Sequence, residues 1–153
     1  MSKVFVALSL CLMALMLVYF CSLFVAPRAH NGEVTDTVRV GSHQYHVIVA
    51  RDVISQARGL SGRPGLPEKT GMLFIFREAA TRAFWMSEML FSIDIIWIRD
   101  GRIIGFVADA PAPQGERPAT FYSPEPADMV LELEAGSVKR DGLAAGDEVK
   151  LVQ

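Results

Sequence analysis

Asp94 is the residue whose type and setting most clearly suggest chemistry. It interrupts a run of β-branched and aromatic residues, Ile93–Ile98, that is typical of a strand. Alternate side chains of a strand point to opposite faces, and here both faces are mostly apolar, so the strand is expected to be buried. A buried carboxylate is costly unless it is paired or hydrogen-bonded. We therefore expect a partner for Asp94 in or beside the core.

Two arginines that precede this region are the expected partners of Asp94. Arg58 and Arg63 flank a stretch rich in glycine, which predicts a loop. A guanidinium group matches a carboxylate with two parallel hydrogen bonds, and such a pair could hold one arginine toward an anionic ligand. The alternative, which we favour, is a structural ion pair that braces the loop against the sheet.

Aromatic residues offer a second kind of binding surface. Trp85 and Met86 belong to the bulky triplet Phe84–Met86, and Tyr122 lies in a proline-rich stretch. Aromatic rings can line a groove and stack on a sugar or a peptide, but most of them are expected in the core. Tyr122 is the expected exception, because it lies in a loop.

Metal binding has limited support in the sequence. Thioethers select soft metals such as Cu(I), so Met72, Met86 and Met89 are an alternative site for copper handling. Methionine is mainly a filler of apolar cores, which is the role expected here. His43 and His46 are three positions apart, so in one strand they point to opposite faces. We predict no metal site and no cofactor.

Catalytic groups do not form a recognisable set. The serines lack a Gly-x-Ser-x-Gly elbow, and both cysteines, Cys11 and Cys21, lie in the N-terminal apolar run. Asp94, Glu88 and Glu132 could form a carboxylate pair for glycoside hydrolysis, but a solvated surface position explains Glu132. A hydrolase or carbohydrate-active enzyme that uses Asp94 is therefore an alternative. We favour a non-catalytic protein and assign no catalytic residue.

The elements that must position these residues are short. Asp52 is a suitable N-cap for a helix over Val53–Arg58 that ends at Gly59, and Asp100-Gly101 is typical of a hairpin turn. Most of the eight prolines fall within Ala110–Pro126, which predicts a long loop. Strands are expected over Thr37–Val40, Tyr45–Ala50, Gly71–Phe76, Ile93–Ile98, Arg102–Ala108, Met129–Glu134 and Asp147–Val152, and a short helix over Gly136–Leu143. Arg77–Arg82 is expected to be a polar connection.

No strand–helix–strand rhythm is evident along the chain. The pattern therefore predicts a mainly β fold, a small barrel-like single domain or sandwich with one or two short helices. Met129–Glu134 alternates apolar and acidic residues and is expected to be half-buried.

The N-terminus predicts a transmembrane helix. Residues 4–26 carry no charge and are almost wholly apolar, and about 20 such residues span a bilayer. The run is longer than the apolar core of a cleavable signal, and Ala26–Ala29 is a poor cleavage site. We expect a signal anchor over residues 1–27, a linker over 28–36 and a β domain over 37–153. If the anchor is retained, the chain is expected at the inner (cytoplasmic) membrane with the domain in the periplasm. If the signal is cleaved, the domain is expected to be secreted or periplasmic.

Seven sequence blocks follow one another within about Thr37–Val152: Arg58–Arg63, Gly71–Phe76, Phe84–Met86, Ile93–Ile98, Tyr122–Pro124, Val130–Gly136 and Gly146–Val149. In this order they resemble an uncharacterised bacterial and archaeal family, domain of unknown function 192 (DUF192). The resemblance implies a small β-barrel domain and no established activity. Members carry Lys after the Phe-Trp-Met triplet and Pro before the Ile-Asp pair, where this chain has Ser87 and Ser92. A binding site that used that lysine would be altered here.

These observations favour a non-catalytic ligand- or partner-binding module of the cell envelope. The expected site lies where the predicted loops meet, with the candidate residues Arg58, Arg63, Trp85, Met86, Asp94 and Tyr122. The expected partners are the membrane, through the N-terminal helix, and a small molecule, a glycan or an envelope protein. Nucleic acid is not expected, because the formal net charge is −2 and no basic run follows the anchor.

Overall fold

The computed structural model describes residues 36–152. The predicted signal anchor, residues 1–27, and nearly all of the predicted linker, 28–36, lie outside the described residues. The elements in chain order are β1 (Asp36–Val40), β2 (His43–Ala50), α2 (Val53–Arg58), β3 (Thr70–Ala80), β4 (Ala83–Trp85), β5 (Ile93–Arg99), β6 (Arg102–Ala110), β7 (Thr120–Tyr122), β8 (Ala127–Glu134), α3 (Ser137–Asp141) and β9 (Val149–Val152). Within residues 36–152, no helix is long and apolar enough to cross a membrane.

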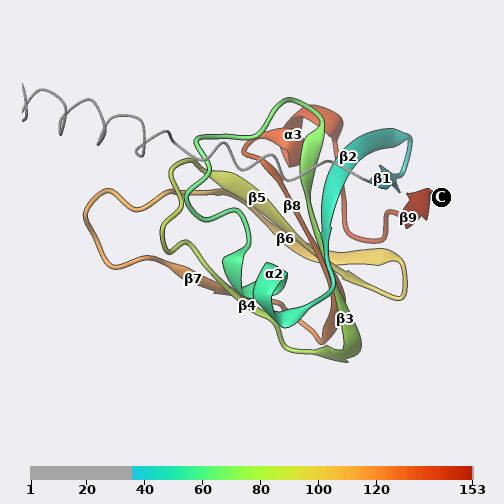
Figure 1. Cartoon of the computed structure of the whole chain (residues 1–153). Helices are drawn as coiled ribbons and strands as arrows, with labels where there is room; N and C mark the ends of the chain where they lie inside the picture. Colours follow the sequence, from blue (N-terminus) through green and yellow to red (C-terminus); the bar gives the residue numbers. More distant parts are fainter. Residues whose placement is uncertain (1–35, 153) are drawn as a thin grey trace, which may run out of the picture. The chain divides into compact units, whose positions relative to one another are not determined.

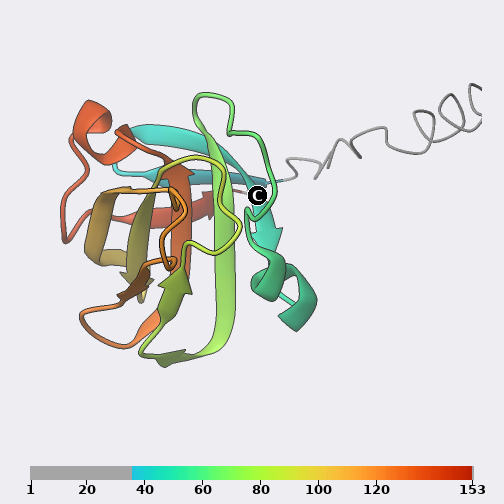
Figure 2. The ribbon, with the colours of Figure 1, turned by 90° about the vertical axis from the view of Figure 1, so that its left-hand side faces the viewer.

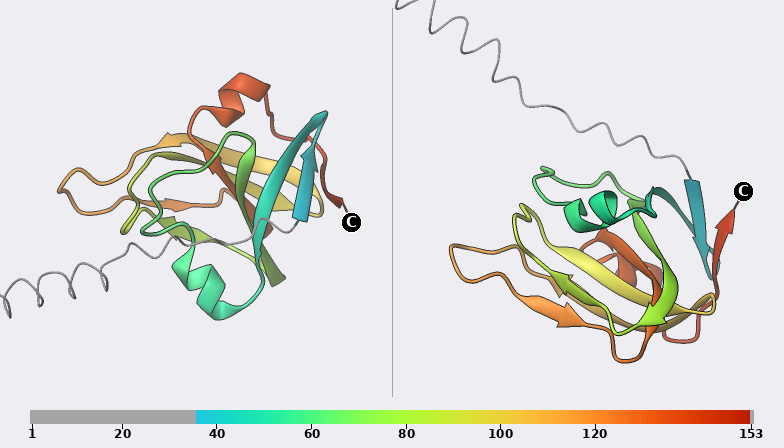
Figure 3. Two further views of the ribbon diagram at one scale, coloured as in Figure 1. Left: turned by 45° about the horizontal axis from the view of Figure 1, so that its top comes forward. Right: turned by 60° about the horizontal axis from the view of Figure 1, so that its bottom comes forward.

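A seven-stranded sheet forms the body of the domain, in the order β6-β5-β8-β3-β2-β1-β9. It curls into a half-barrel (Figures 1 and 3). Its two edges meet at one end, where Arg102 forms an isolated antiparallel bridge with Glu148. Strands β4 and β7 form a separate two-stranded ribbon. The prediction of a mainly β, barrel-like domain with two short helices is therefore confirmed.

One pair of neighbouring strands departs from the prediction. β2 and β3 run parallel, from His46 opposite Thr70 to Ala50 opposite Phe74, and α2 lies in the connection between them. This is a strand–helix–strand unit. The sequence predicts its three elements one by one, but their parallel pairing depends on contacts between distant segments. β3 also continues to Ala80, so that most of the expected polar connection is strand.

Local turn and cap signals are realised as the sequence predicts. The carboxylate of Asp52 accepts hydrogen bonds of 3.0 Å from the N–H groups of Ile54 and Ser55, and α2 ends at Gly59. Asp100 and Gly101 have φ of 49° and 70°, the left-handed backbone that a tight two-residue hairpin turn between β5 and β6 requires.

The sheet is buried on both faces, because each face carries its own apolar cluster. The α3-side core contains Val38, Val40, Tyr45, Val47, Leu73, Ile96, Ile98, Ile103, Leu131, Leu133, Val138, Leu143 and Val149. The α2-side core contains Ala50, Leu60, Met72, Phe74, Met86, Met89, Ile93, Ile95, Trp97, Ala110, Ala127 and Val130. Figure 2 shows α3 and α2 on different sides of the curled sheet.

β8 is the strand for which the predicted burial was wrong. It lies between β5 and β3, and the apolar clusters on both faces of the sheet cover its middle, so that Val130 to Leu133 are all buried. Glu132, expected at a solvated surface, retains only 6% of its accessible area. The alternation of apolar and acidic residues is real, but tertiary packing covers the acidic face as well.

Candidate functional site

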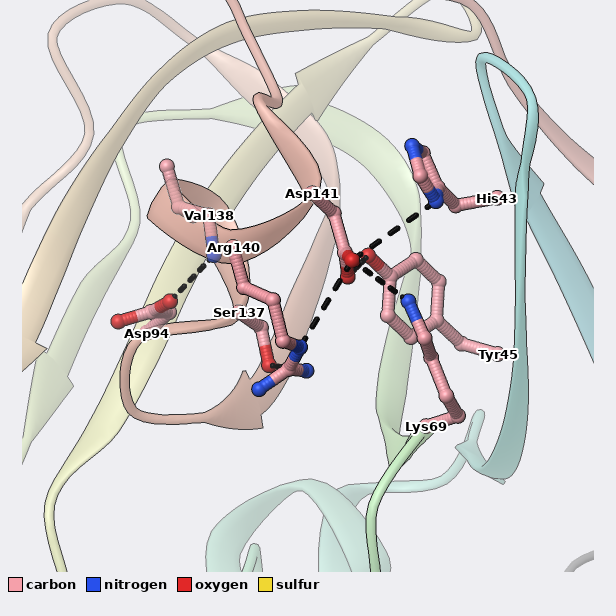
Figure 4. A network of polar contacts seen from close by, with 8 residues as sticks. All are labelled: His43, Tyr45, Lys69, Asp94, Ser137, Val138, Arg140 and Asp141. Atoms are coloured by element: carbon pink, nitrogen blue, oxygen red, sulfur yellow. Dashed lines mark hydrogen bonds and ion pairs between the residues drawn. The ribbon is translucent and has the colours of Figure 1, made fainter.

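Asp94 is buried on the α3 side of the sheet, and backbone amides satisfy its carboxylate. Its Oδ1 accepts hydrogen bonds from the N–H groups of Asp109 at 2.8 Å and Gly136 at 3.2 Å, and its Oδ2 accepts one from Val138 at 2.7 Å. Figure 4 shows the bond to Val138. Gly136 and Val138 belong to the first turn of α3, where N–H groups lack intrahelical acceptors. Asp94 therefore fastens this turn to the sheet.

A β-bulge supplies the remaining amide. Ile93 lies opposite Ala110 but Ile95 lies opposite Val107, so β6 has one extra residue facing Asp94. Asp109, in this extra stretch, has φ of 54° and directs its N–H at the carboxylate. The partner expected for Asp94 exists, but it is backbone and not the guanidinium of Arg58 or Arg63. The acid that lies beside Arg58 is a different residue.

That residue is Glu132, on the opposite face of the sheet. It lines a hollow of about 60 Å³ that we call the Glu132 hollow. The hollow is formed by the end of α2 and the following turn, by β4, and by side chains from the sheet. Its lining consists of Ala57, Arg58, Gly59, Leu60, Ser61, Phe74, Ala83, Phe84, Trp85, Met89 and Glu132.

Glu132 is poorly solvated and incompletely bonded. Within the described residues, its Oε2 is buried and has no hydrogen-bond partner. Burial raises the pKa of the Glu132 carboxyl from 4.5 to about 8, so the group is largely protonated at neutral pH. A strongly shifted acid in a cleft is a common property of functional sites. The hollow is therefore our candidate functional site.

Two hydrogen bonds hold the loop after α2, which includes Ser61 of the lining, in place. The N–H of Gly62 donates to the carbonyl of Glu88 at 2.9 Å, and the hydroxyl of Ser61 donates to the carbonyl of Ser87 at 3.1 Å. They join the loop after α2 to the turn after β4, segments that are distant in sequence. The predicted meeting of these two loops is thus seen in the structure.

Of the candidate residues, Arg58 and Trp85 line the hollow together. Trp85 is 65% exposed and Tyr122 is 64% exposed. Trp85 pairs with Thr120, and Ala83 pairs with Tyr122, in the antiparallel β4–β7 ribbon. The two rings therefore occupy diagonal positions on one face of the ribbon. Tyr122 is therefore exposed as expected, but it lies in strand β7 and not in a loop.

Met86 and the other candidate copper ligands are core residues. Met72, Met86 and Met89 are all buried in the α2-side core. His46 lies 3.3 Å from the hydroxyl of Thr37, and His43 faces Asp141. Among residues 36–152, no cluster of three or more His, Cys, Asp or Glu side chains could hold a metal ion.

A second polar network surrounds Asp141 (Figure 4). The hydroxyl of Tyr45 donates to its Oδ2 at 2.5 Å, and the ammonium of Lys69 lies 2.7 Å from its Oδ1. Burial acts to raise the pKa of Asp141, but hydrogen bonds from Lys69 and Tyr45 outweigh it and hold the pKa below its ordinary value. Burial and the bond to Asp141 raise the pKa of Tyr45 far above 10. Both carboxylate oxygens have partners, so we assign this network to fastening α3 to β2.

A sequence signal for Glu132 was available. Val130, Leu131 and Leu133 surround it, so both faces of this strand are partly apolar. A sheet with one face in water would leave the glutamate exposed, whereas a sheet covered on both faces would bury it. Only the tertiary packing distinguishes these cases.

The fold and the hollow together define a class: a small, curled β domain with one buried acid at the base of a surface hollow. Residues 35–151 match the model of DUF192, described as "Uncharacterized ACR". The chain belongs to this family.

Two solved structures are similar to the chain. A "putative transcription regulator" from Sinorhizobium meliloti 1021 has 33% sequence identity and a TM-score of 0.70, over 76% of this chain and 92% of that chain. A protein of unknown function from Novosphingobium aromaticivorans DSM 12444 has 29% identity and a TM-score of 0.70, over 82% of this chain and 90% of that chain. No curated protein matches the chain.

Proposed function

We propose that this protein is a non-catalytic ligand-binding module and that its site is the Glu132 hollow. The observation that carries the proposal is a carboxyl group, 6% exposed, that lines a surface hollow with its Oε2 unbonded within the described part of the chain. Burying a polar group without a partner costs free energy. A ligand that bonds to this oxygen recovers that free energy.

Binding is favoured over hydrolysis by the placement of the acids. Glycosidases use two carboxyl groups that flank one bond, about 5 to 9.5 Å apart. Asp94 and Glu132 belong to opposite faces of the sheet, and three N–H groups occupy the oxygens of Asp94. The alternative of a hydrolase that uses Asp94 therefore has little support. A hydrolase screen in which Asp94→Asn abolishes an observed activity would reinstate it.

Copper handling is a second candidate, favoured by one observation. Met72, Met86 and Met89 are buried in the same core, and Met89 lines the hollow. Thioethers are suitable ligands for Cu(I). A titration with Cu(I) tests the idea: micromolar binding that Met89→Leu removes would support it, and absence of binding would exclude it.

We propose that the domain acts outside the cytoplasm, held at the inner membrane by its N-terminal segment. The support is the uncharged apolar run over residues 4–26, which is long enough to span a bilayer. The chain should then remain in the membrane fraction after alkaline carbonate extraction. Release into the soluble fraction would favour a cleaved signal.

Nucleic-acid binding, which the name of one similar structure suggests for that protein, is not part of this proposal. The formal net charge of the chain is −2, and no basic run follows the apolar segment. A small molecule, a glycan or a peptide end from an envelope protein remains the proposed kind of ligand.

Blocking the hollow provides a direct test. Ala57 lines the hollow and is exposed on α2, so Ala57→Phe places a ring at its entrance without filling the core. A metabolite and glycan screen by thermal shift should give ligands that stabilise the wild-type chain but not Ala57→Phe. Ala145→Phe, at an exposed position away from the hollow, is the matched control. Equal stabilisation of all three proteins would contradict the proposal.

A further inference from the structure

We propose that the Glu132 hollow receives the primary ammonium group of a small organic amine, with Oε2 of Glu132 as its hydrogen-bond acceptor. This inference rests on the proposed function and adds the class of ligand. It starts from the chemistry of the hollow: its lining has one acidic side chain, one arginine and one serine, and the other side chains are aromatic, thioether or aliphatic. An ionised carboxyl group accepts hydrogen bonds only, and an ammonium group donates three.

The size of the hollow limits what can enter. Its volume is about 60 Å³, and one water-sized group needs roughly 10 to 15 Å³ on this measure. The hollow therefore holds about four or five non-hydrogen atoms. A short alkylammonium group fits, whereas a sugar ring or an aromatic ring is too large to enter completely.

The walls favour a cation over an anion. Phe74 and Phe84 meet edge to face, with ring centroids 4.9 Å apart at 88°, and both line the hollow. Trp85 lines it as well and is exposed. Ring faces carry negative electrostatic potential, and Trp attracts cations most strongly of the three aromatic types. These three aromatic residues of the lining therefore suit an ammonium group better than an anion.

Arg58 is the one cationic side chain in the lining. Its charge opposes a simple monocation at the entrance. This gives the proposal a directional consequence, because Arg58→Gln should strengthen the binding of a plain amine a few-fold. Glu132→Gln should have the opposite effect.

Proton linkage gives a second directional consequence. Glu132 has a pKa of about 8, so at pH 7 most of the carboxyl groups must release a proton to solvent when the ammonium binds. An alkylammonium group remains charged, since its pKa is close to the 10.4 of lysine. The affinity for the amine should therefore increase about tenfold for each unit by which the pH rises toward 8, and it should level off above pH 8.

The experiment uses the full-length chain and three probes: propylammonium, 1-propanol of equal size, and tetramethylammonium, which has no N–H donor. Binding is followed by NMR at the indole N–H of Trp85 and the amide of Gly59, both in the lining. Propylammonium should bind at least tenfold more tightly than 1-propanol at pH 8, and more tightly than tetramethylammonium. Glu132→Gln should abolish this preference while leaving the weak binding of 1-propanol.

Glu134→Gln is the matched control, because it makes the same substitution in the same strand at a residue outside the lining. It should change the affinity much less than Glu132→Gln. If 1-propanol binds as well as propylammonium, or if Glu132→Gln has no effect, the inference of an amine ligand fails. The proposed ligand-binding function of the hollow is not affected by that result. If no probe shifts the resonances of Trp85 and Gly59, and the thermal-shift screen gives no ligand that Ala57→Phe excludes, the proposed function fails as well.

Discussion

Asp94 and Glu132 lie on adjacent central strands but face opposite sides of the sheet. Asp94 pairs with Leu133, and Glu132 pairs with Ile95, so the two carboxyl groups are one register step apart. Side chains one step apart point to opposite faces. Asp94 meets three backbone N–H groups, whereas Glu132 lines the hollow. The same residue chemistry therefore serves structure on one face and, as we propose, binding on the other.

Stability should depend on pH through Glu132. Its pKa is about 8 when folded and near 4.5 when unfolded, so the folded chain holds the proton more strongly. The contribution of Glu132 to stability is then greatest below about pH 4.5, falls by about 1.4 kcal/mol for each pH unit between about 4.5 and 8, and levels off above about pH 8. Urea unfolding at a series of pH values between 5 and 9 measures this slope. Glu132→Gln should lack this component of the slope, and Glu134→Gln should keep it.

Asp94→Asn should destabilise the free protein. The amide that replaces one oxygen is a donor and would face N–H groups that are also donors, so at least one hydrogen bond is lost in a buried setting. We expect a loss of roughly 2 to 4 kcal/mol in the free energy of unfolding. Ligand binding at the Glu132 hollow should persist wherever the variant is folded. A variant with wild-type stability but no ligand binding would place the site at Asp94.

Gly71→Ala should also destabilise the protein. A Cβ atom at Gly71 would overlap the backbone carbonyl of Glu132 and lie 2.7 Å from Cδ2 of Leu133. Relieving the overlap requires β3 and β8 to separate, and overpacking of this kind costs about 1 to 3 kcal/mol. Gly65→Ala is the control, because nothing lies within 4 Å of its added Cβ. Equal midpoints of denaturation for the two variants would contradict the strand contact.

The two tryptophans should respond differently to solvent and to ligand. Trp97 is 3% exposed and Trp85 is 65% exposed. The Trp97→Phe variant leaves Trp85 as the sole tryptophan, and it should fluoresce at long wavelength with strong acrylamide quenching. Its stability cost should be modest, since within residues 36–152 the indole N–H of Trp97 has no acceptor. A ligand in the hollow should reduce the quenching, and unchanged quenching at saturation would show that it binds elsewhere.

Local features of the chain could be predicted from the sequence. The Asp52 cap, the Asp100-Gly101 turn and the strand over Ile93–Ile98 each depend on neighbouring residues, and all three are present in the structure. The burial of Asp94 followed from the apolar residues on both sides of it. Its partners did not, because the amides of Asp109 and Val138 are 15 and 44 residues away.

The sequence by itself determined the mainly β character, the short helices, the positions of the tight turns and the requirement that Asp94 be satisfied inside the core. Those properties arise from backbone preferences and from the alternation of side chains, which act over a few residues. The tertiary structure decided that β8 lies between β3 and β5, and that the end of α2, the turn after it and β4 cover the face of the sheet on which Glu132 is buried beside Arg58 and Trp85. Strand order depends on contacts between distant segments, and no local pattern specifies which strand becomes central.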